Sequence, residues 1–226
     1  MNRSPGKFLS ISLAVLGGVL LAAPMNGCNI VGGLYTVAHG PPKIPAVYEP
    51  DRTRTTVLLI DDLNNILPRR SLRDRMGSTA EEVMLRNRVI TDGNLISSVS
   101  ARRVVSGEQS TSRMSAVDIA REVGAEVVIH VTMRAWTLQT EPGMISPAAV
   151  AEVKVIDAVQ NVRIWPPTDE GYPLMIRVPR STTEDVGTSL ADRMRIEEQL
   201  ADRAGLQLAQ MFFQHERERL SEQMRQ

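Results

Sequence analysis

The distribution of apolar residues along this chain predicts a series of strands. Residues 55–62 (TTVLLIDD) form a nearly continuous apolar run closed by two aspartates, which favours a central strand covered on both faces. Residues 126–136 and 149–157 alternate between apolar and polar positions, which is typical of strands with one buried face. Residues 162–165 (VRIW) continue this pattern after a short turn. Residues 96–106 (ISSVSARRVVS) form a weaker strand, which we expect near a sheet edge.

The last two strands of the alternating pattern are expected to pair as a hairpin, because only the turn DAVQN separates them. Val162 and Ile164 would then face the core, with Val162 opposite Val155. Arg163 and Trp165 would point outward. The pattern thus predicts a hairpin whose outer face carries a large aromatic side chain.

The helices are predicted from capping signals and helical spacing. Ser78 and Glu81 form a capping box at the start of one helix. Ser115 marks the start of a short second helix, and Gly124 is the expected left-handed residue just past its end. Residues 187–219 carry apolar side chains close to every third or fourth position, which predicts a long C-terminal helix.

The predicted order is strand, helix, strand, helix, strand, strand, strand, helix. This order predicts an α/β fold (an α+β sandwich): a small mixed β-sheet with helices packed on one face and a long C-terminal helix. The chain of 226 residues is long enough for one hydrophobic core. Because aromatic residues make up only 4% of the chain, we expect that core to rest on aliphatic side chains and methionine.

The N-terminal part of the chain has the pattern of an export signal. Two basic residues precede the uncharged residues 8–23, a run shorter than the roughly 20 residues that a bilayer-spanning helix needs. We therefore expect residues 1–27 to be a signal peptide of the lipoprotein type. Residues 28–53 are rich in Gly and Pro, which predicts a flexible tether, and residues 54–226 would form the α/β domain.

Cys28 is the only cysteine of the chain, and its place just past the apolar run predicts lipidation. Bacterial lipoprotein signals end in a box of small residues that is followed by a cysteine, the first mature residue. Met25 and Gly27 fit such a box, whereas Asn26 departs from it. Two or three acyl chains such as palmitate, at about 0.8 kcal/mol per buried methylene, would anchor the protein stably. An uncleaved anchor and plain secretion are the alternatives.

The charge of the chain argues against a general attraction to nucleic acid. Formal net charge is zero, so the molecule as a whole does not attract polyanions. One basic cluster interrupts this balance and is expected to be a solvated loop, with anionic lipid headgroups or an acidic partner as the alternative ligands. The cluster consists of Arg69, Arg70, Arg73 and Arg75.

Two stretches and the C-terminal helix together resemble a known family. Residues 117–133 (VDIAREVGAEVVIHVTM) resemble the helix–Gly-Ala–strand element, and residues 151–165 (AEVKVIDAVQNVRIW) the following hairpin, of extracytoplasmic α/β lipoprotein domains. The curli-secretion lipoprotein, the penicillin-binding-protein activator lipoproteins and the N-terminal domain of TolB share this domain. The resemblance covers about residues 54–215 and departs at the turn, where Asn161 replaces the usual glycine. It implies a non-catalytic module that binds proteins or assembles in the envelope.

Two tryptophans are the candidate partner-binding residues. Trp136 and Trp165 fall on the polar face of predicted strands, together with Arg134 and Arg163. Large aromatic side chains among charges on an open sheet face are typical of an interaction surface. The alternative is that the long segment 166–185 folds over the two rings.

Asp61 and Asp62 are the candidate residues for metal binding or catalysis, because ligands of α/β sheets bind at the carboxyl ends of strands. The pair could hold Mg²⁺, although no further ligand motif accompanies it. The alternative is a purely structural role in a strand-end turn, in which aspartate accepts hydrogen bonds from local N–H groups. His130 is expected to be a partly buried sheet residue. The motifs GxSxG, HExxH and CxxC are absent, so we predict no catalytic residue, no metal ligand and no cofactor.

These patterns predict a lipid-anchored cell-envelope lipoprotein on the periplasmic side, with a non-catalytic domain for protein interaction or scaffolding. Its partners would be the membrane, through the lipid at Cys28, and envelope proteins; nucleic acid is excluded and an oligomer is allowed. One alternative is a metal-dependent or hydrolytic envelope enzyme that uses Asp61 and Asp62. The other is a ring- or channel-forming assembly subunit.

Overall fold

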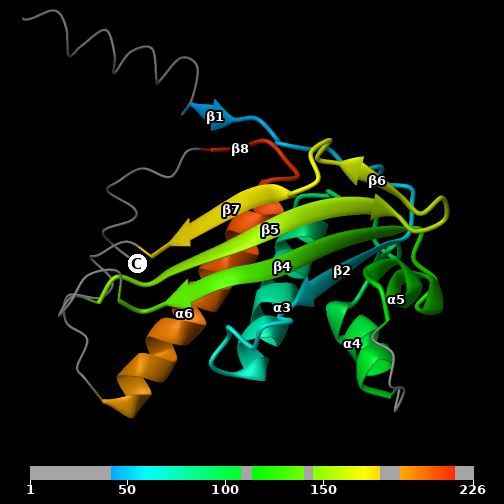
Figure 1. Ribbon diagram of the computed structural model, residues 1–226. Helices are drawn as coiled ribbons and strands as arrows, with labels where there is room; N and C mark the ends of the chain where they lie inside the picture. The colour runs from blue at the N-terminus through cyan, green and yellow to red at the C-terminus, as the bar shows by residue number, and fades with distance from the viewer. Residues whose placement is uncertain (1–41, 108–113, 140–144, 179–188, 217–226) are drawn as a thin grey trace, which may run out of the picture. The chain divides into compact units, whose positions relative to one another are not determined.

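The computed structural model describes residues 42–107, 114–139, 145–178 and 189–216 (Figure 1). The predicted signal peptide, Cys28 and most of the predicted tether lie outside these residues. The strands are β1 (Lys43–Ile44), β2 (Thr56–Asp61), β3 (Leu95–Ile96), β4 (Val127–Thr137), β5 (Ala148–Asp157), β6 (Val162–Trp165), β7 (Tyr172–Arg177) and β8 (His215–Glu216). The helices are α3 (Arg70–Arg86), α4 (Ser98–Gly107), α5 (Ala116–Glu122) and α6 (Leu190–Gln210). None of the helices in the described ranges is both long and apolar enough to cross a membrane.

The main sheet has six strands and a mixed topology. Its order is β3-β2-β4-β5-β6, and β7 also pairs with β5. β2 runs parallel to β3 and β4, whereas β5 runs antiparallel to β4, β6 and β7. In this register Asp61 lies beside Thr132, and His130 lies between Leu59 and Lys154. The predicted mixed sheet is confirmed, with β1 and β8 forming a separate two-stranded sheet.

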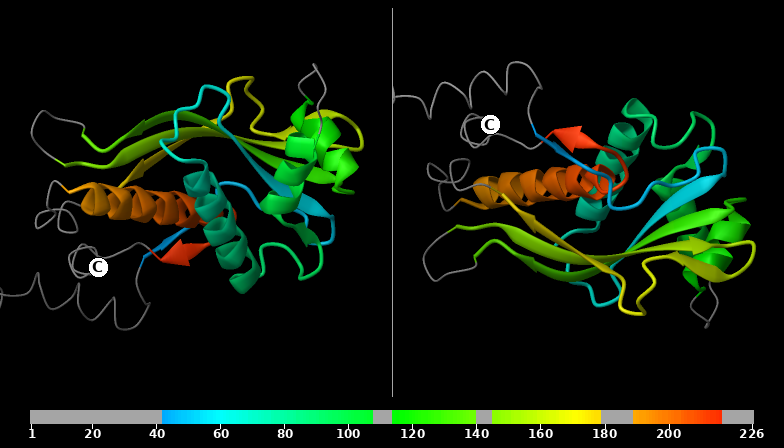
Figure 2. Two further views of the ribbon diagram at one scale, coloured as in Figure 1. Left: turned by 90° about the horizontal axis from the view of Figure 1, so that it is seen from below. Right: turned by 90° about the horizontal axis from the view of Figure 1, so that it is seen from above.

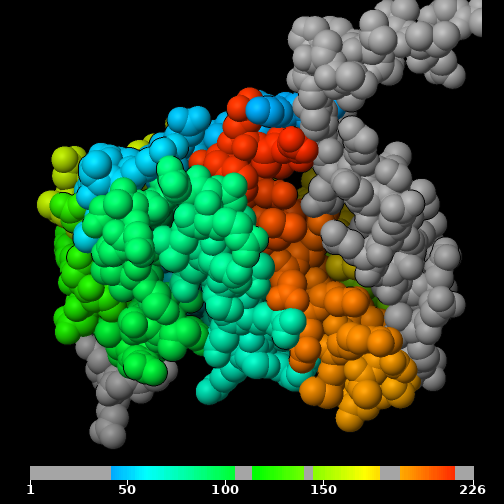
Figure 3. Space-filling model, turned by 180° about the vertical axis from the view of Figure 1, so that it is seen from behind, coloured from blue at the N-terminus to red at the C-terminus, as the bar shows by residue number. Residues whose placement is uncertain are grey.

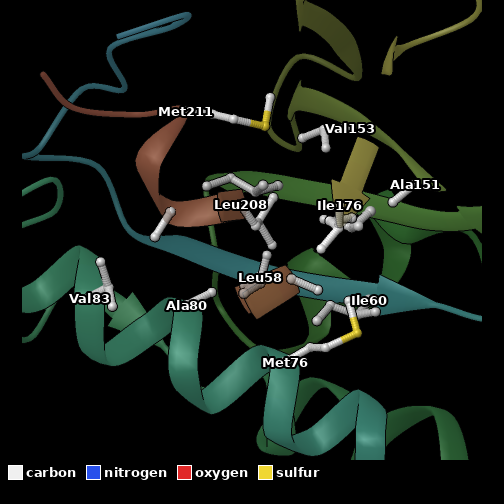
Figure 4. Close-up of a cluster of buried hydrophobic side chains, with 14 of the residues drawn as sticks. Leu58, Ile60, Met76, Ala80, Val83, Ala151, Val153, Ile176, Leu208 and Met211 are labelled. Carbon is white, nitrogen blue, oxygen red and sulfur yellow. The ribbon is translucent and has the colours of Figure 1, made fainter. Parts of the chain in front are cut away.

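The main core lies between one face of this sheet and the two longer helices, α3 and α6. Figure 4 shows Leu58 and Ile60 of β2, Met76 and Ala80 of α3, and Leu208 of α6 pointing into one interior, and none of them is more than 2% exposed. Burying a leucine or isoleucine side chain contributes about 1.5–3 kcal/mol each. The core therefore rests on aliphatic residues and methionine, and the predicted long C-terminal helix covers it.

A second, smaller core lies on the opposite face of the sheet. Val57, Leu59 and Val128 point to this face and pack with Ala101 of α4 and Ile119 of α5. Figure 2 shows α3 and α6 beneath the long strands, with α4 and α5 gathered at one end of the sheet. The two short helices therefore cover only the part of this face that belongs to β2 and the start of β4.

The strand predicted over residues 96–106 is wrong. Only β3 pairs with the sheet, and the rest of the segment is helix α4. Ala101 is fully buried while Val99 is 38% exposed, so alternate residues do not share one face as they would in a strand. The N–H of Ser98 donates to Oε1 of Glu81 at 2.6 Å and fixes the start of α4 against α3. A contact between distant residues thus decides this element.

The start predicted for the first helix is also wrong. α3 begins at Arg70, and Ser78 lies inside it with its hydroxyl donating to the carbonyl of Arg75 at 3.1 Å. Two hydrogen bonds of 2.7 Å join the Arg75 guanidinium to the carboxylate of Asp202 on α6. The segment predicted as an arginine-rich loop is helical because α6 supplies acidic partners for it.

The inward and outward sides predicted for β6, the second strand of the hairpin, are reversed. Trp165, not Val162, lies opposite Val155, because the pairing of β5 and β6 contains a register shift. Val162 and Ile164 are 54% and 40% exposed. The Trp165 ring instead stacks on Tyr48, with 5.7 Å between the centroids. An aromatic ring buries more surface than one aliphatic side chain, which favours this register.

The predicted cap of the short helix and the predicted residues of two turns are confirmed. Ser115 caps α5 by accepting from the N–H of Asp118 at 3.2 Å. Gly124, just past the end of α5, has φ +77°, and Asn161 in the β5–β6 turn has φ +58°. The long helix begins after a second serine cap, Ser189, and ends earlier than the predicted residue 219, at Gln210.

Residues 44–53, predicted as the end of a flexible tether, lie against the domain. The N–H groups of Val47 and Tyr48 both donate to the carbonyl of Met211, at 2.7 and 3.2 Å. The Tyr48 ring also meets the Phe212 ring edge-on, with 6.5 Å between the centroids. The compact unit begins at Ile44, which is earlier than the predicted boundary at residue 54.

Candidate functional site

Half of the second sheet face carries no helix in the described part of the chain. We call this half the open face; it is formed by β4, β5 and β7. Figure 1 views the sheet from this side, with α3 and α6 behind the strands. Along each strand, buried residues alternate with half-buried or exposed ones. The half-buried and exposed set on the open face is His130, Thr132, Arg134, Val150, Glu152, Lys154, Pro173, Met175 and Arg177.

Polar side chains of neighbouring strands lie in pairs on the open face. Nη2 of Arg134 on β4 lies 2.6 Å from Oε2 of Glu152 on β5, and this hydrogen bond raises the pKa of Arg134. Nε2 of His130 lies 3.5 Å from Oδ2 of Asp61 at the end of β2. Cross-strand pairs of this kind hold neighbouring side chains in fixed positions. The open face therefore presents an ordered pattern of positive and negative groups.

The outer edge of the sheet, formed by β6 and β7 with the turn before them, carries exposed apolar side chains. Four large apolar side chains there are strongly exposed: Val159 at 63%, Val162 at 54%, Ile164 at 40% and Met175 at 69%. Single exposed apolar residues are normal, whereas several along one edge indicate a contact surface. The charged open face is thus bordered by an apolar margin.

Trp136 does not share the open face with Arg134 as predicted. A register irregularity between Met133 and Ala135 interrupts the alternation of β4. Beyond it Trp136 lies beside Ala149, a core residue that is 1% exposed, and the indole packs against the main core. One additional residue in the strand is enough to turn the ring to the other side.

Trp165 also lies on the core side. Its ring lies between Tyr48 and Tyr172, with centroids 5.7 and 4.9 Å away. For the Trp165 ring, this contact favours the alternative that the segment 166–185 folds over it, because Tyr172 belongs to that segment. Arg163 pairs with the exposed Asp169 at 2.6 Å. The grouping of both rings and both arginines on one face is wrong, and partner binding by these four residues stays a prediction.

The two aspartates at the end of β2 have separate local roles. Both carboxylate oxygens of Asp62 accept hydrogen bonds from the next turn, from the N–H groups of Ile66 at 2.7 Å and Leu67 at 3.1 Å. Asp61 instead faces His130. Within the described ranges, no group of three or more His, Cys, Asp or Glu side chains is placed to hold a metal ion. Asp62 thus acts in the turn after β2.

The predicted arginine cluster lies at the start of α3, where its members have different partners. Nε of Arg69 lies 3.0 Å from Oε2 of Glu197, whose side chain is only 7% exposed, and Arg75 pairs with Asp202. These two arginines therefore join α3 to α6. No carboxylate among the described residues pairs with Arg70 or Arg73.

Two open-face residues were not singled out from the sequence. The alternation of residues 149–157 predicts Glu152 outward, and the structure confirms this side, but its pairing with Arg134 depends on the strand register. Met175 lies in a segment without a strong pattern, and no sequence signal shows which side of the sheet it takes. Only the pairing of β7 with β5 places Met175 beside Val150.

No protein-family model and no curated protein matches the chain. Among solved structures, lipoprotein GNA1162 from Neisseria meningitidis is similar at 13% identity and TM-score 0.41, covering 63% of this chain and 92% of its own. The PelC dodecamer from Paraburkholderia phytofirmans is similar at 9% identity and TM-score 0.40, covering 77% of this chain and 97% of its own. The LpoB C-terminal domain from Salmonella enterica is similar at 20% identity and TM-score 0.27, covering 56% of this chain and 84% of its own. These TM-scores lie below 0.5, so the function proposed below rests on the chain's own residues.

Proposed function

We propose that this chain is a lipid-anchored protein of the cell envelope whose non-catalytic α/β domain binds another protein through the open face. The observation that carries the proposal is the uncovered half of the sheet. Arginine and methionine, which are enriched at protein interfaces, occur there as Arg134, Met175 and Arg177. A charged centre with an apolar margin would give a partner both orientation and buried area.

The anchoring part of the proposal is supported by the sequence before the domain. The uncharged run 8–23 precedes Cys28, and the compact unit begins at Ile44. The intervening residues 29–43 reach roughly 50 Å when fully extended, at about 3.3–3.6 Å per residue. A lipid on Cys28 would thus confine the domain, and any partner it binds, to the neighbourhood of the membrane.

Metabolic labelling tests the anchor. Cells that express the full chain are fed a labelled fatty acid, and the wild type is compared with Cys28→Ser. Label on the wild type that is lost from the variant is the expected result, because only a thiol at that position accepts the thioether-linked diacylglycerol. An unlabelled wild-type protein would remove the anchoring part and leave the open face untouched.

Exchanging the two charges of one ion pair tests the open face. The double variant Arg134→Glu, Glu152→Arg keeps a salt bridge between β4 and β5 but reverses its direction toward a partner. We expect the protein to keep its unfolding temperature and to recover at least about tenfold less partner after crosslinking in intact cells and affinity purification, as for loss of a good charge pair. Reversing the exposed pair Glu82→Arg, Arg86→Glu on α3 is the matched control, for which recovery should not change.

A further inference from the structure

Helices α3 and α4 approach each other most closely at a glycine. A Cβ on Gly77 would lie 2.4 Å from Oγ of Ser98, so no larger residue fits at this crossing. Figure 3 shows α3 and α4 side by side on the surface. Arg73 precedes Gly77 by four residues and Arg102 follows Ser98 by four, so each arginine continues the face of its helix that meets the other. The crossing thus brings two arginines from distant parts of the chain together.

Two arginines but only one paired carboxylate lie at one end of this junction, because the carboxylate of Glu81 accepts from the N–H of Ser98 at the other end. Arg102 pairs with Asp74, and its side chain is only 19% exposed. Burial lowers the pKa of Arg102, and the nearby charge of Arg73 lowers it further. The buried Nε atoms of Arg73 and Arg102 have no hydrogen-bond partner among the described residues. Asp74 therefore pairs with Arg102 and leaves Arg73 without a carboxylate partner among the described residues, a costly arrangement unless a further anion is present.

The start of α3 adds to this positive potential. Its N-cap residue, Arg69, makes no side-chain cap hydrogen bond, and its first turn holds no acidic residue. Helix starts ordinarily carry Asp, Glu, Ser or Thr, because the N–H groups there are unpaired and the dipole is positive. Glu197 and Glu198 of α6 pair with Arg69 at this start, and Arg73 lies one turn beyond them, where the first turn supplies no acidic side chain.

We infer that Arg73 and Arg102 form a binding site for a phosphate group at the junction of α3 and α4. Guanidinium groups bind phosphate oxygens through paired, charge-assisted hydrogen bonds. The phosphate could belong to a membrane lipid headgroup or to a soluble phosphate ester, since both present the same oxygens. The site is separate from the open face and does not depend on the proposed protein binding.

The repulsion between the two arginines gives a distinctive expectation. In buffer without phosphate, Arg73→Gln should leave the unfolding temperature unchanged or raise it, because a like charge beside Arg102 is removed. Inorganic phosphate should stabilise the wild type. The apparent affinity of the variant for phosphate should be at least about tenfold lower than that of the wild type. An arginine with a purely structural role would destabilise the protein in both buffers when it is replaced.

The experiment uses the full chain in vesicles of a galactolipid, which carries no phosphate, and measures hydrogen exchange of residues 70–78 and 98–104. Inorganic phosphate is titrated against sodium chloride of equal ionic strength. We expect phosphate to slow exchange in the wild type and in the control double variant Arg86→Gln, Arg88→Gln. It should not slow exchange in the single variant Arg73→Gln or in the double variant Arg73→Gln, Arg102→Gln. Equal behaviour of the wild type and Arg73→Gln, which keeps the Arg102–Asp74 pair, would overturn the site.

A second arm identifies the source of the phosphate. The same exchange is measured without soluble phosphate in vesicles that contain phosphatidylglycerol. Slower exchange that depends on Arg73 assigns the site to lipid headgroups, and slower exchange only with inorganic phosphate assigns it to a soluble ester. If neither addition slows exchange in the wild type, the inference is wrong.

Discussion

Asp157 shows how one carboxylate can join two parts of the fold. Its Oδ2 lies 2.9 Å from Nη1 of Arg54, just before β2, and its Oδ1 accepts the N–H of Gln160 in the β5–β6 turn at 2.8 Å. The hydrogen bond from Arg54, followed by that from Gln160, lowers the pKa of Asp157. The side chain is only 8% exposed, so no solvent replaces these partners readily.

This residue makes stability depend on pH. Because the pKa of Asp157 is lower in the folded state than in the unfolded state, its contribution is complete above the unfolded value, about 3.9, and is lost as pH falls through the lower folded value. Asp157→Ala should cost about 1–3 kcal/mol at pH 7 and much less in strong acid. Urea unfolding of the full chain at both pH values measures the difference. Equal losses at the two values would contradict the assignment.

Single residues that govern local turns were predictable because the reason is contained in the residue itself. Asn161 takes the left-handed conformation because its short polar side chain tolerates it, and Ser115 caps α5 because its hydroxyl reaches the nearby N–H of Asp118. The pair of His130 and Asp61 was not predictable in this way. It depends on the register of β2 against β4, which no local signal specifies.

At the scale of elements, the contact between α3 and α6 depends on a missing side chain. A Cβ on Gly205 would lie 2.5 Å from the carbonyl oxygen of Met76 and 2.8 Å from Cβ of Thr79. The two helices can approach this closely only because α6 has glycine at the crossing. The ion pairs of Arg69 and Arg75 then hold the same two helices along their length.

Filling this crossing should weaken the domain. Gly205→Ala favours helix formation by about 1 kcal/mol, but its methyl group meets backbone that cannot yield, which costs about 1–3 kcal/mol. We expect a net destabilisation, seen as a lower urea midpoint with an unchanged slope. Gln210→Ala, elsewhere on α6, should stay within about 0.5 kcal/mol. A Gly205→Ala protein as stable as the wild type would show that the helices are farther apart than described.

The elements that the sequence missed are those that distant contacts decide. The segment 96–106 alternates well enough for a strand, yet Ser98 and Glu81 start it as a helix against α3. The irregularity after Met133 and the register of β6 reverse the sides of Trp136 and Trp165. Periodicity therefore predicted the central strands and α6, whereas faces beyond an irregularity could not be read from it.

At the scale of the whole molecule, the domain includes a segment that composition assigns to the tether. Pro and Gly around residues 41–50 predict coil, and residues 45–50 form neither helix nor strand, but Tyr48 fixes them between Trp165 and Phe212. Burial raises the pKa of Tyr48, which agrees with a ring set into the domain. Composition thus predicted the absence of regular structure and missed the attachment.

Removing the Tyr48 ring should release this segment. Tyr48→Ala should destabilise the domain by about 2 kcal/mol, less than a fully buried aromatic costs, and should shift tryptophan emission to the red because Trp165 meets water. Tyr48→Phe keeps the ring and should stay near the wild type. Fluorescence-detected urea unfolding of the full chain measures both. An unshifted spectrum for Tyr48→Ala would contradict the attachment.

The central claim is that the open face of this sheet binds another protein in the envelope. The most direct measurement places a photo-crosslinking amino acid at Met175, on the edge of that face, and in a parallel strain at Leu85, an exposed apolar residue of α3. After irradiation of intact cells, we predict a discrete crosslinked product from position 175 that Arg134→Glu, Glu152→Arg removes, and none from position 85. A product from position 85 alone, or one from position 175 that survives the exchange, would contradict the account.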